Sequence, residues 1–145
     1  NSVIMGYPTG VLVDASKGTP TDNNIKANTL NIQSTIVAGS ATPVSYSAST
    51  TAPTGWTLDS ARNWFLTPAY GNSILVTNDE VKLAAPYNYS NPDFTPQDGS
   101  PLLTGASFTN LKVTGFTPVT YRGAVGPAGT PDADWWKGWS KLALN

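Results

Sequence analysis

The sequence predicts an all-β fold: a short parallel β-helix of about two coils in residues 1–50, then a loop-rich aromatic C-terminal cap in residues 51–145. Three observations favour it. Residues 33–38 repeat the pattern of residues 1–6, at an offset of 33 − 1 = 32 positions. Apolar and polar residues alternate from Leu30 onward, as in a half-buried strand. Gly and Pro, with 13 and 12 residues, supply many turns.

Two strands and a turn are expected near the N-terminus. Residues 3–5 and 11–13 are short apolar runs rich in β-branched side chains, which predict strands. Residues 7–10, Tyr-Pro-Thr-Gly, have the composition of a turn between them. The polar residues 14–28 that follow predict a protruding loop.

A third strand is expected at residues 30–37. Its even-numbered residues lie on one face and its odd-numbered residues on the other, the period of a strand. Aligning Ile4 over Ile36 stacks this strand on the first and gives two successive coils. The alternative is a β-sandwich in which two similar strands match by chance.

The rest of the chain predicts few regular elements. Residues 45–54 have the Ser, Thr, Ala and Pro content of a linker, and residues 73–77 predict one strand. Helix is expected only near residues 59–63 and from Asp132, which can cap a first turn.

Composition excludes several classes of function. The chain has 145 residues, a formal net charge of −1 and 12% charged residues, so it lacks the basic surface of a nucleic-acid-binding protein. Cys and His are absent, which excludes disulfides and zinc sites built on those ligands. No apolar run reaches the ~20 residues of a membrane helix, so we expect no membrane insertion. The chain begins with Asn1, so we expect a processed protein or a segment of a longer one. Its content of Gly, Pro, Ser, Thr and Asn favours an extracellular or cell-surface location.

Several motifs resemble a known family. They are residues 64–72 (WFLTPAYGN), 91–94 (NPDF), 99–108 (GSPLLTGASF), 119–126 (VTYRGAVG) and 134–139 (DWWKGW). Together they resemble the C-terminal region of bacterial, Bacteroidetes-like surface or secreted proteins with a right-handed parallel β-helix. The resemblance implies a right-handed β-helix, with further coils ahead of residue 1.

Candidate sites follow from this architecture. We expect Trp135, Trp136 and Trp139 to plug one end of the stack, because repeat folds need a cap. Arg122 is expected to be structural, pairing with a carboxylate or with carbonyls under the cap. The other end exposes strand edges of the first coil. That assembly edge comprises Val3, Ile4, Met5, Val11 and Val13.

No catalytic or metal-binding residue set stands out, and no cofactor is expected. Calcium is the alternative, since it binds loop carboxylates. The candidate ligands are Asp79, Glu80, Asp93, Asp98, Asp132 and Asp134. They lack the spacing of a calcium loop, and none of their spacings singles out a glycosidase pair.

The sequence thus predicts a non-catalytic structural module that self-associates or docks through its N-terminal β edge. Its partner would be copies of itself, in which case filaments could form, or upstream β-helix coils of the same protein. The alternative is a carbohydrate-binding module of a surface adhesin or polysaccharide-processing protein. Rings available for stacking on a polysaccharide are Trp56, Trp64, Tyr87 and Tyr89.

Overall fold

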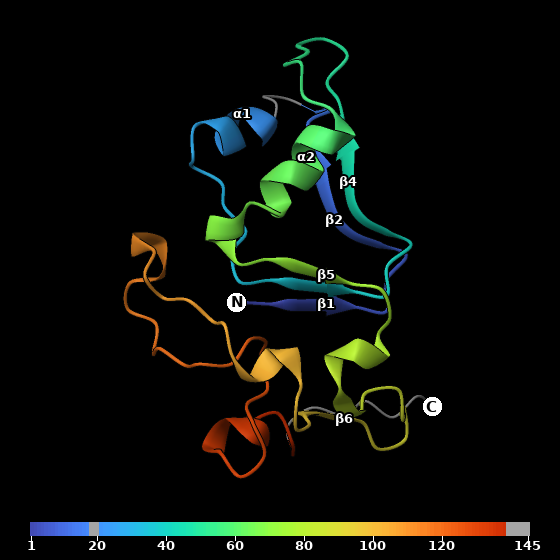
Figure 1. Cartoon of the computed structure of the whole chain (residues 1–145), viewed down its shortest axis with the longest axis vertical. Helices are drawn as coiled ribbons and strands as arrows, with labels where there is room; N and C mark the ends of the chain where they lie inside the picture. Colours follow the sequence, from blue (N-terminus) through green and yellow to red (C-terminus); the bar gives the residue numbers. More distant parts are fainter. Residues whose placement is uncertain (18–20, 139–145) are drawn as a thin grey trace.

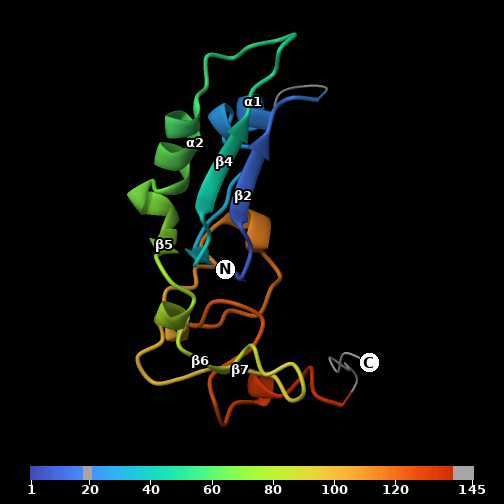
Figure 2. The ribbon, with the colours of Figure 1, turned by 90° about the vertical axis from the view of Figure 1, so that its right-hand side faces the viewer.

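The computed structural model describes residues 1–17 and 21–138 and shows two parallel β-sheets, an antiparallel strand pair and two α-helices in these residues (Figure 1). The strands are β1 (Val3–Met5), β2 (Thr9–Asp14), β3 (Ile36–Ala38), β4 (Thr42–Ser47), β5 (Ser73–Leu75), β6 (Leu83–Ala85) and β7 (Asp93–Pro96). The α-helices are α1 (Thr21–Lys26) and α2 (Leu58–Phe65). Short 3-10 helices are η1 (Pro68–Tyr70), η2 (Asp79–Val81), η3 (Pro101–Leu103), η4 (Leu111–Val113) and η5 (Pro131–Ala133). Figure 2 shows β2 and β4 side by side with α2 against them.

The parallel sheets arise because the chain makes two similar passes. β3 lies between β1 and β5, with Val3 opposite Ile36, and β2 pairs with β4, with Val11 opposite Val44. The offset between the passes is 36 − 3 = 33 for one sheet and 44 − 11 = 33 for the other. The predicted offset of 32 is therefore wrong by one residue. In a strand, a shift of one residue moves every side chain to the opposite face.

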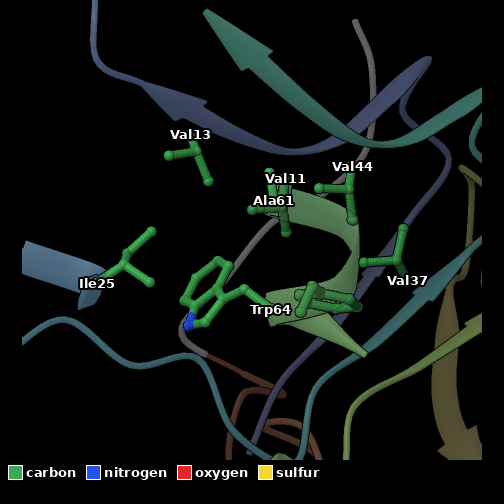
Figure 3. Close-up of a cluster of buried hydrophobic side chains, with 8 residues drawn as sticks. Val11, Val13, Ile25, Val37, Val44, Ala61 and Trp64 are labelled. Carbon is green, nitrogen blue, oxygen red and sulfur yellow. The ribbon is translucent and has the colours of Figure 1, made fainter. Parts of the chain in front are cut away.

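The first hydrophobic core lies between the β2–β4 sheet and α2 (Figure 3). β2 directs Val11 and Val13 inward, while Leu12 between them is 53% exposed. α2 contributes Ala61, Trp64 and Phe65, whose spacing places them on one helical face. The whole cluster is Val11, Val13, Ile25, Val37, Val44, Ala61, Trp64 and Phe65.

The β1–β3–β5 sheet contacts the first core on one face, through Ile4, Val37 and Ile74, and the second core on its other face. Its buried residues are Ile36, Ala38, Val81 and Leu102, with Val3, Met5, Leu75 and Leu83 packed against them. All three residues of β3 are 0% exposed, because Val37 belongs to the first core while Ile36 and Ala38 belong to the second. Strands buried on both faces are continuously apolar, as this one is.

Local sequence explains where α2 begins. Thr57 and Ser60 form a capping box: each accepts from the backbone N–H of the other, at 3.3 Å and 3.2 Å. The helix then packs against β4. The predicted helix near residues 59–63 is confirmed. At Asp132 only the 3-10 helix η5 forms, with Asp132 inside it, so an α-helix there is wrong.

The C-terminal half is irregular. β6 and β7 are antiparallel, with Leu83 opposite Pro96. Beyond them, buried Ser100 donates to the carbonyl of Val81 at 2.6 Å and accepts from Leu102 N–H at 3.1 Å. These bonds hold Leu102 in the second core.

The all-β class is wrong. Two α-helices and an antiparallel pair accompany the parallel sheets, and no closed β-helix is evident among the described residues. Residues 14–28, predicted as a loop, contain α1. Residues 30–35 are not a strand, because Ser34 has φ +51°, in the left-handed region. The predicted linker at residues 45–54 overlaps β4.

Other predicted elements are confirmed. β1 and β2 coincide with the two N-terminal strands, and β5 lies within the strand expected at residues 73–77. The boundary at residue 50 assigns α2 and β5 to the cap, yet α2 packs on β4 and β5 pairs with β3.

Replacing Gly10 with Ala tests the close approach of the two passes. A Cβ there would lie 2.6 Å from the carbonyl oxygen of Pro43 and would also collide with the Val37 side chain. We expect urea denaturation to show a loss of about 1–3 kcal/mol in the free energy of unfolding. The neighbouring exposed Thr9→Ala should change it by less than about 0.5 kcal/mol. Equal stability of Gly10→Ala and Thr9→Ala would contradict the described packing.

Candidate functional site

An apolar cavity lies beside β1. Figure 1 shows β1 at the lower edge of its sheet, facing the C-terminal half of the chain. The cavity between them has a volume of about 340 Å³. Its lining residues are Val3, Met5, Leu83, Pro86, Tyr87, Phe94, Leu102, Arg122, Gly123, Ala124 and Val125. We call this cavity the β1 pocket.

One side of β1 carries backbone groups that do not pair with β3. Ile36 N–H donates to the Ser2 carbonyl at 2.9 Å, which fixes the alternation of the parallel ladder with β3. In such a ladder successive residues direct their N–H and C=O groups to opposite sides. The backbone N–H and C=O groups of Val3 and Met5 therefore point away from β3, toward the outer edge of the sheet. β1 is an edge strand of the sheet among the described residues.

The C-terminal segment covers one end of this edge. Gly123 N–H donates to the Asn1 carbonyl at 3.2 Å. The side chain of Asn1 accepts from Ser107 N–H at 2.8 Å and donates to the Ser107 carbonyl at 2.9 Å, much as a neighbouring strand would. These bonds lie at Asn1, so among the described residues the part of the edge without a paired strand is β1 itself.

The floor of the β1 pocket belongs to the second core. Val3, Met5, Leu83 and Leu102 are members of both. Around β3 the same core is closed, with Ile36 and Ala38 at 0% exposure. The second core is thus complete beside β3 and hollow beside β1.

The pocket wall at residues 122–125 is braced from behind. Trp135 Nε1 donates to the Ala124 carbonyl, and Gly126 N–H donates to the Asp132 carbonyl at 3.0 Å. The Tyr121 hydroxyl donates to Asp132 at 2.8 Å. Burial, together with this carboxylate, raises the pKa of Tyr121 to about 12, so the hydroxyl stays protonated near neutrality.

The residues of the predicted assembly edge lie on β1 and β2, and their side chains are buried or partly buried. Val11 and Val13 are buried in the first core, against which Ile4 packs, and Val3 and Met5 pack against the second. These residues therefore pack against the two cores and do not form an exposed apolar patch.

The predicted cap residues lie in the C-terminal half. Trp136 packs against Phe94, with ring centroids 5.3 Å apart, and Trp135 braces the pocket wall while remaining 48% exposed. Trp139 lies outside the described residues. Arg122 lines the β1 pocket instead of forming an ion pair, since the ion pairs of the described residues are Asp59–Arg62 and Asp134–Lys137.

The predicted sugar-stacking rings do not form one platform. Trp64 is 8% exposed within the first core, so its face is not accessible. Trp56 is partly buried, 6.3 Å from Tyr46 between ring centroids, with Lys26 above its ring. Tyr87 and Tyr89 are exposed, and Tyr87 also lines the β1 pocket.

A buried carboxylate lies behind the first core. Asp22 is 0% exposed and accepts from the Tyr46 hydroxyl at 2.7 Å and from the Thr54 hydroxyl. Burial alone would raise the pKa of Asp22, but these hydroxyls and the charge of Lys26 outweigh burial and lower it. Asp22 thereby ties α1 to β4 and to the following loop.

The carboxylates considered for calcium are dispersed. Glu80 accepts from Thr77, Asp93 from Thr95, Asp132 from Tyr121, and Asp134 pairs with Lys137 at 2.6 Å. No cluster of three or more acidic residues able to hold a metal ion occurs in residues 1–17 and 21–138.

Several pocket residues were not predicted from sequence. Leu83, Pro86, Phe94, Leu102 and residues 123–125 come from irregular segments whose approach to β1 leaves no periodic pattern. A local signal is Gly123, whose φ of +93° favours glycine and whose added Cβ would be in ordinary contact with the Val3 side chain at 3.4 Å.

Comparisons of the chain with models of protein families, with curated proteins and with solved structures each found no match. The resemblance to bacterial β-helix proteins therefore stays a prediction. Across the part of the chain that the structure describes, none of the helices has the length and apolar character needed to cross a membrane.

The Asp22 cluster makes stability depend on pH. Because the pKa of Asp22 is lowered by folding, its carboxylate stabilises the fold above the ordinary Asp pKa of about 3.9, and this contribution is lost as pH falls through the lower folded pKa. We expect Asp22→Asn to lower the unfolding free energy at pH 7 by about 1–3 kcal/mol and to flatten its decline below about pH 4. Urea denaturation over a pH series measures both.

The exposed Asp98 provides the matched control. Asp98→Asn should leave the acid-side decline close to that of the unmodified chain. An Asp22→Asn variant with the same pH profile as the unmodified chain would show that the cluster does not contribute.

Proposed function

We propose that this chain is a non-catalytic assembly module that docks an extended segment of a protein along the free edge of β1. The observation that carries this proposal is the coincidence of an edge strand with an apolar pocket at its side. Strand addition uses both features: backbone hydrogen bonds supply affinity, and pockets for alternate side chains supply specificity.

The side-chain alternation of β1 defines what a docked strand would meet. Ile4 faces the first core, while Val3 and Met5 face the second core and line the β1 pocket. A strand paired with β1 would direct alternate side chains toward these two sides. An apolar side chain on the pocket side would fill the hollow in the second core.

The size of the pocket is suited to side chains rather than to a flat contact. Its volume of about 340 Å³ lies at the lower end of the roughly 300–1,000 Å³ of ligand pockets. Tyr87 and Phe94 add aromatic surface to its wall. Burying an apolar side chain there would contribute about 1.5–3 kcal/mol.

A second copy of the chain is one source of such a segment. β5 is the other edge of the three-stranded sheet, and its Ile74 and Leu75 pack toward the first and second cores as Ile4 and Met5 do. Docking of β5 on β1 of another copy would be head-to-tail, a contact that does not close and so extends into filaments. Upstream coils of a longer protein would use the same edge.

Carbohydrate binding is the second function considered. The exposed rings of Tyr87 and Tyr89 favour it, whereas the burial of Trp64 removes one expected stacking surface. An apolar pocket beside strand backbone suits a peptide better than a hydroxyl-rich sugar.

Filling the pocket tests the docking proposal. Ala124 is exposed on the pocket wall, so Ala124→Trp would occupy the cavity without removing a core side chain. Ala128 is also exposed and does not line the β1 pocket, so Ala128→Trp is the matched control. We expect phage-displayed random peptides to be enriched on the immobilised chain and on Ala128→Trp, and this enrichment to fall at least about 10-fold on Ala124→Trp.

Two further readings accompany the selection. Sedimentation of the chain at increasing concentration, and binding of a peptide copying residues 71–77, show whether a second copy supplies the strand. Hydrogen exchange should slow at Val3 and Met5 when a peptide binds. Absence of any enriched peptide, combined with a monomeric chain that ignores the residue 71–77 peptide, would refute docking at β1.

A further inference from the structure

We propose that the β1 pocket selects an extended segment in which a carboxylate lies next to an apolar side chain, with Arg122 as the residue that binds the carboxylate. This inference rests on the strand docking proposed above and names the chemistry of the docked segment. It assigns to Arg122 a recognition role in place of the structural role expected from the sequence.

Arg122 has no counter-ion among the residues that the structure describes. Arg122 lines the β1 pocket, whose other lining residues are almost entirely apolar. Within residues 1–17 and 21–138 no carboxylate lies within ion-pair distance of it, and its buried Nε has no hydrogen-bond partner. Burial also lowers the pKa of Arg122, although a guanidinium stays charged near neutrality. A partly buried charge without a partner costs free energy, and a carboxylate from a ligand would offset part of that cost.

The guanidinium is held in place by backbone rather than by charge. Arg122 N–H donates to the Leu102 carbonyl at 2.7 Å. The side chain lies against the α-carbon of Gly105, where a Cβ would approach Arg122 Cζ to 2.7 Å. Gly105 therefore leaves the space that the guanidinium occupies, and Arg122 is placed before any ligand arrives. A planar guanidinium so placed can bind both oxygens of a carboxylate.

The two ends of the pocket differ, which sets the order of groups in the ligand. Arg122 adjoins Gly123, whose N–H bonds to the Asn1 carbonyl, so the cation lies at the start of β1. Tyr87 lies at the other end, where its hydroxyl would be 3.3 Å from a Cβ added at Gly6. Met5, Leu83 and Phe94 line the apolar space. A docked segment would place its carboxylate near Asn1 and its apolar side chain along β1.

Two sources of carboxylate fit this order. A strand antiparallel to β1 ends near Asn1, so its C-terminal carboxylate could reach Arg122. A parallel strand begins there, so an Asp or Glu side chain preceding the apolar residue would be needed. Residues 71–77 of this chain, which include β5, carry no carboxylate. The chemistry of the pocket therefore favours a segment of another protein over β5 of a second copy.

The experiment compares two peptide arrays on the full chain and on variants of Arg122. One array carries random heptapeptides with free C-termini, and the other carries the same peptides amidated at the C-terminus. Arg122→Gln removes the charge, Arg122→Lys keeps the charge but not the fork, and Arg62→Gln removes an exposed arginine far from the pocket residues in sequence. Circular dichroism and thermal unfolding of each variant establish that it is folded.

We expect the strongest binders of the unmodified chain and of Arg62→Gln to carry a carboxylate beside an apolar residue. Arg122→Gln should weaken these binders about 10-fold or more, with Arg122→Lys between the two, and should leave peptides without a carboxylate unchanged. Loss of binding on amidation identifies a C-terminal carboxylate as the source, and its survival identifies a side chain.

The outcomes separate this inference from the docking proposal. Binders that are apolar, need no carboxylate and tolerate Arg122→Gln would overturn the role of Arg122 while supporting docking at β1. A misfolded Arg122→Gln leaves the composition of the peptides bound by the unmodified chain as the deciding measurement. Arrays without any binder would overturn both.

Discussion

The structure depends on the burial of β3 on both faces. Ile36, Val37 and Ala38 are all 0% exposed, because parallel pairing with β1 and β5 lets one strand serve two cores. Three residues bury little area by themselves, so the fold relies on α2 to close the first core and on η3 to close the second. Continuous apolar character, rather than alternation, is what this position demands.

The same stacking creates the exposed edge. A sheet that grows by adding parallel passes ends in a strand whose outer backbone groups need partners, and natural proteins cover such edges. In this chain the C-terminal half bonds to Asn1, through Ser107 and Gly123, just before β1 begins. The hollow beside β1 follows from that arrangement, since the second core continues under β1 without side chains to close it.

Sequence predicted the strands at the front of the chain and missed their register. Apolar runs at β1, β2 and β5 are local signals, and so is the start of α2. The offset of 33 is visible in matching pairs, namely Gly6 with Gly39, Thr9 with Thr42 and Val11 with Val44. Gly6 and Gly39 both have positive φ, at +80° and +64°, so both similar segments of the chain turn at a glycine after their first strand. Aligning the identical residues Ile4 and Ile36 instead gave an offset of 32, whereas the structure pairs Val3 with Ile36 and Ile4 with Val37, because Val and Ile are interchangeable in strands.

The sequence predicted the strand β1 but not the pocket beside it, and the reason is physical. An edge strand follows from the order of local elements, whereas the pocket depends on irregular segments more than seventy residues away, whose approach is set by single hydrogen bonds such as Arg122 N–H to Leu102. Arg122 was expected to be structural, pairing with a carboxylate or with backbone carbonyls under the cap. Its side chain instead lies along Gly105 and faces apolar walls. Among the described residues no carboxylate forms an ion pair with this cation, which is the arrangement expected if, as we propose, a docked partner supplies the charge.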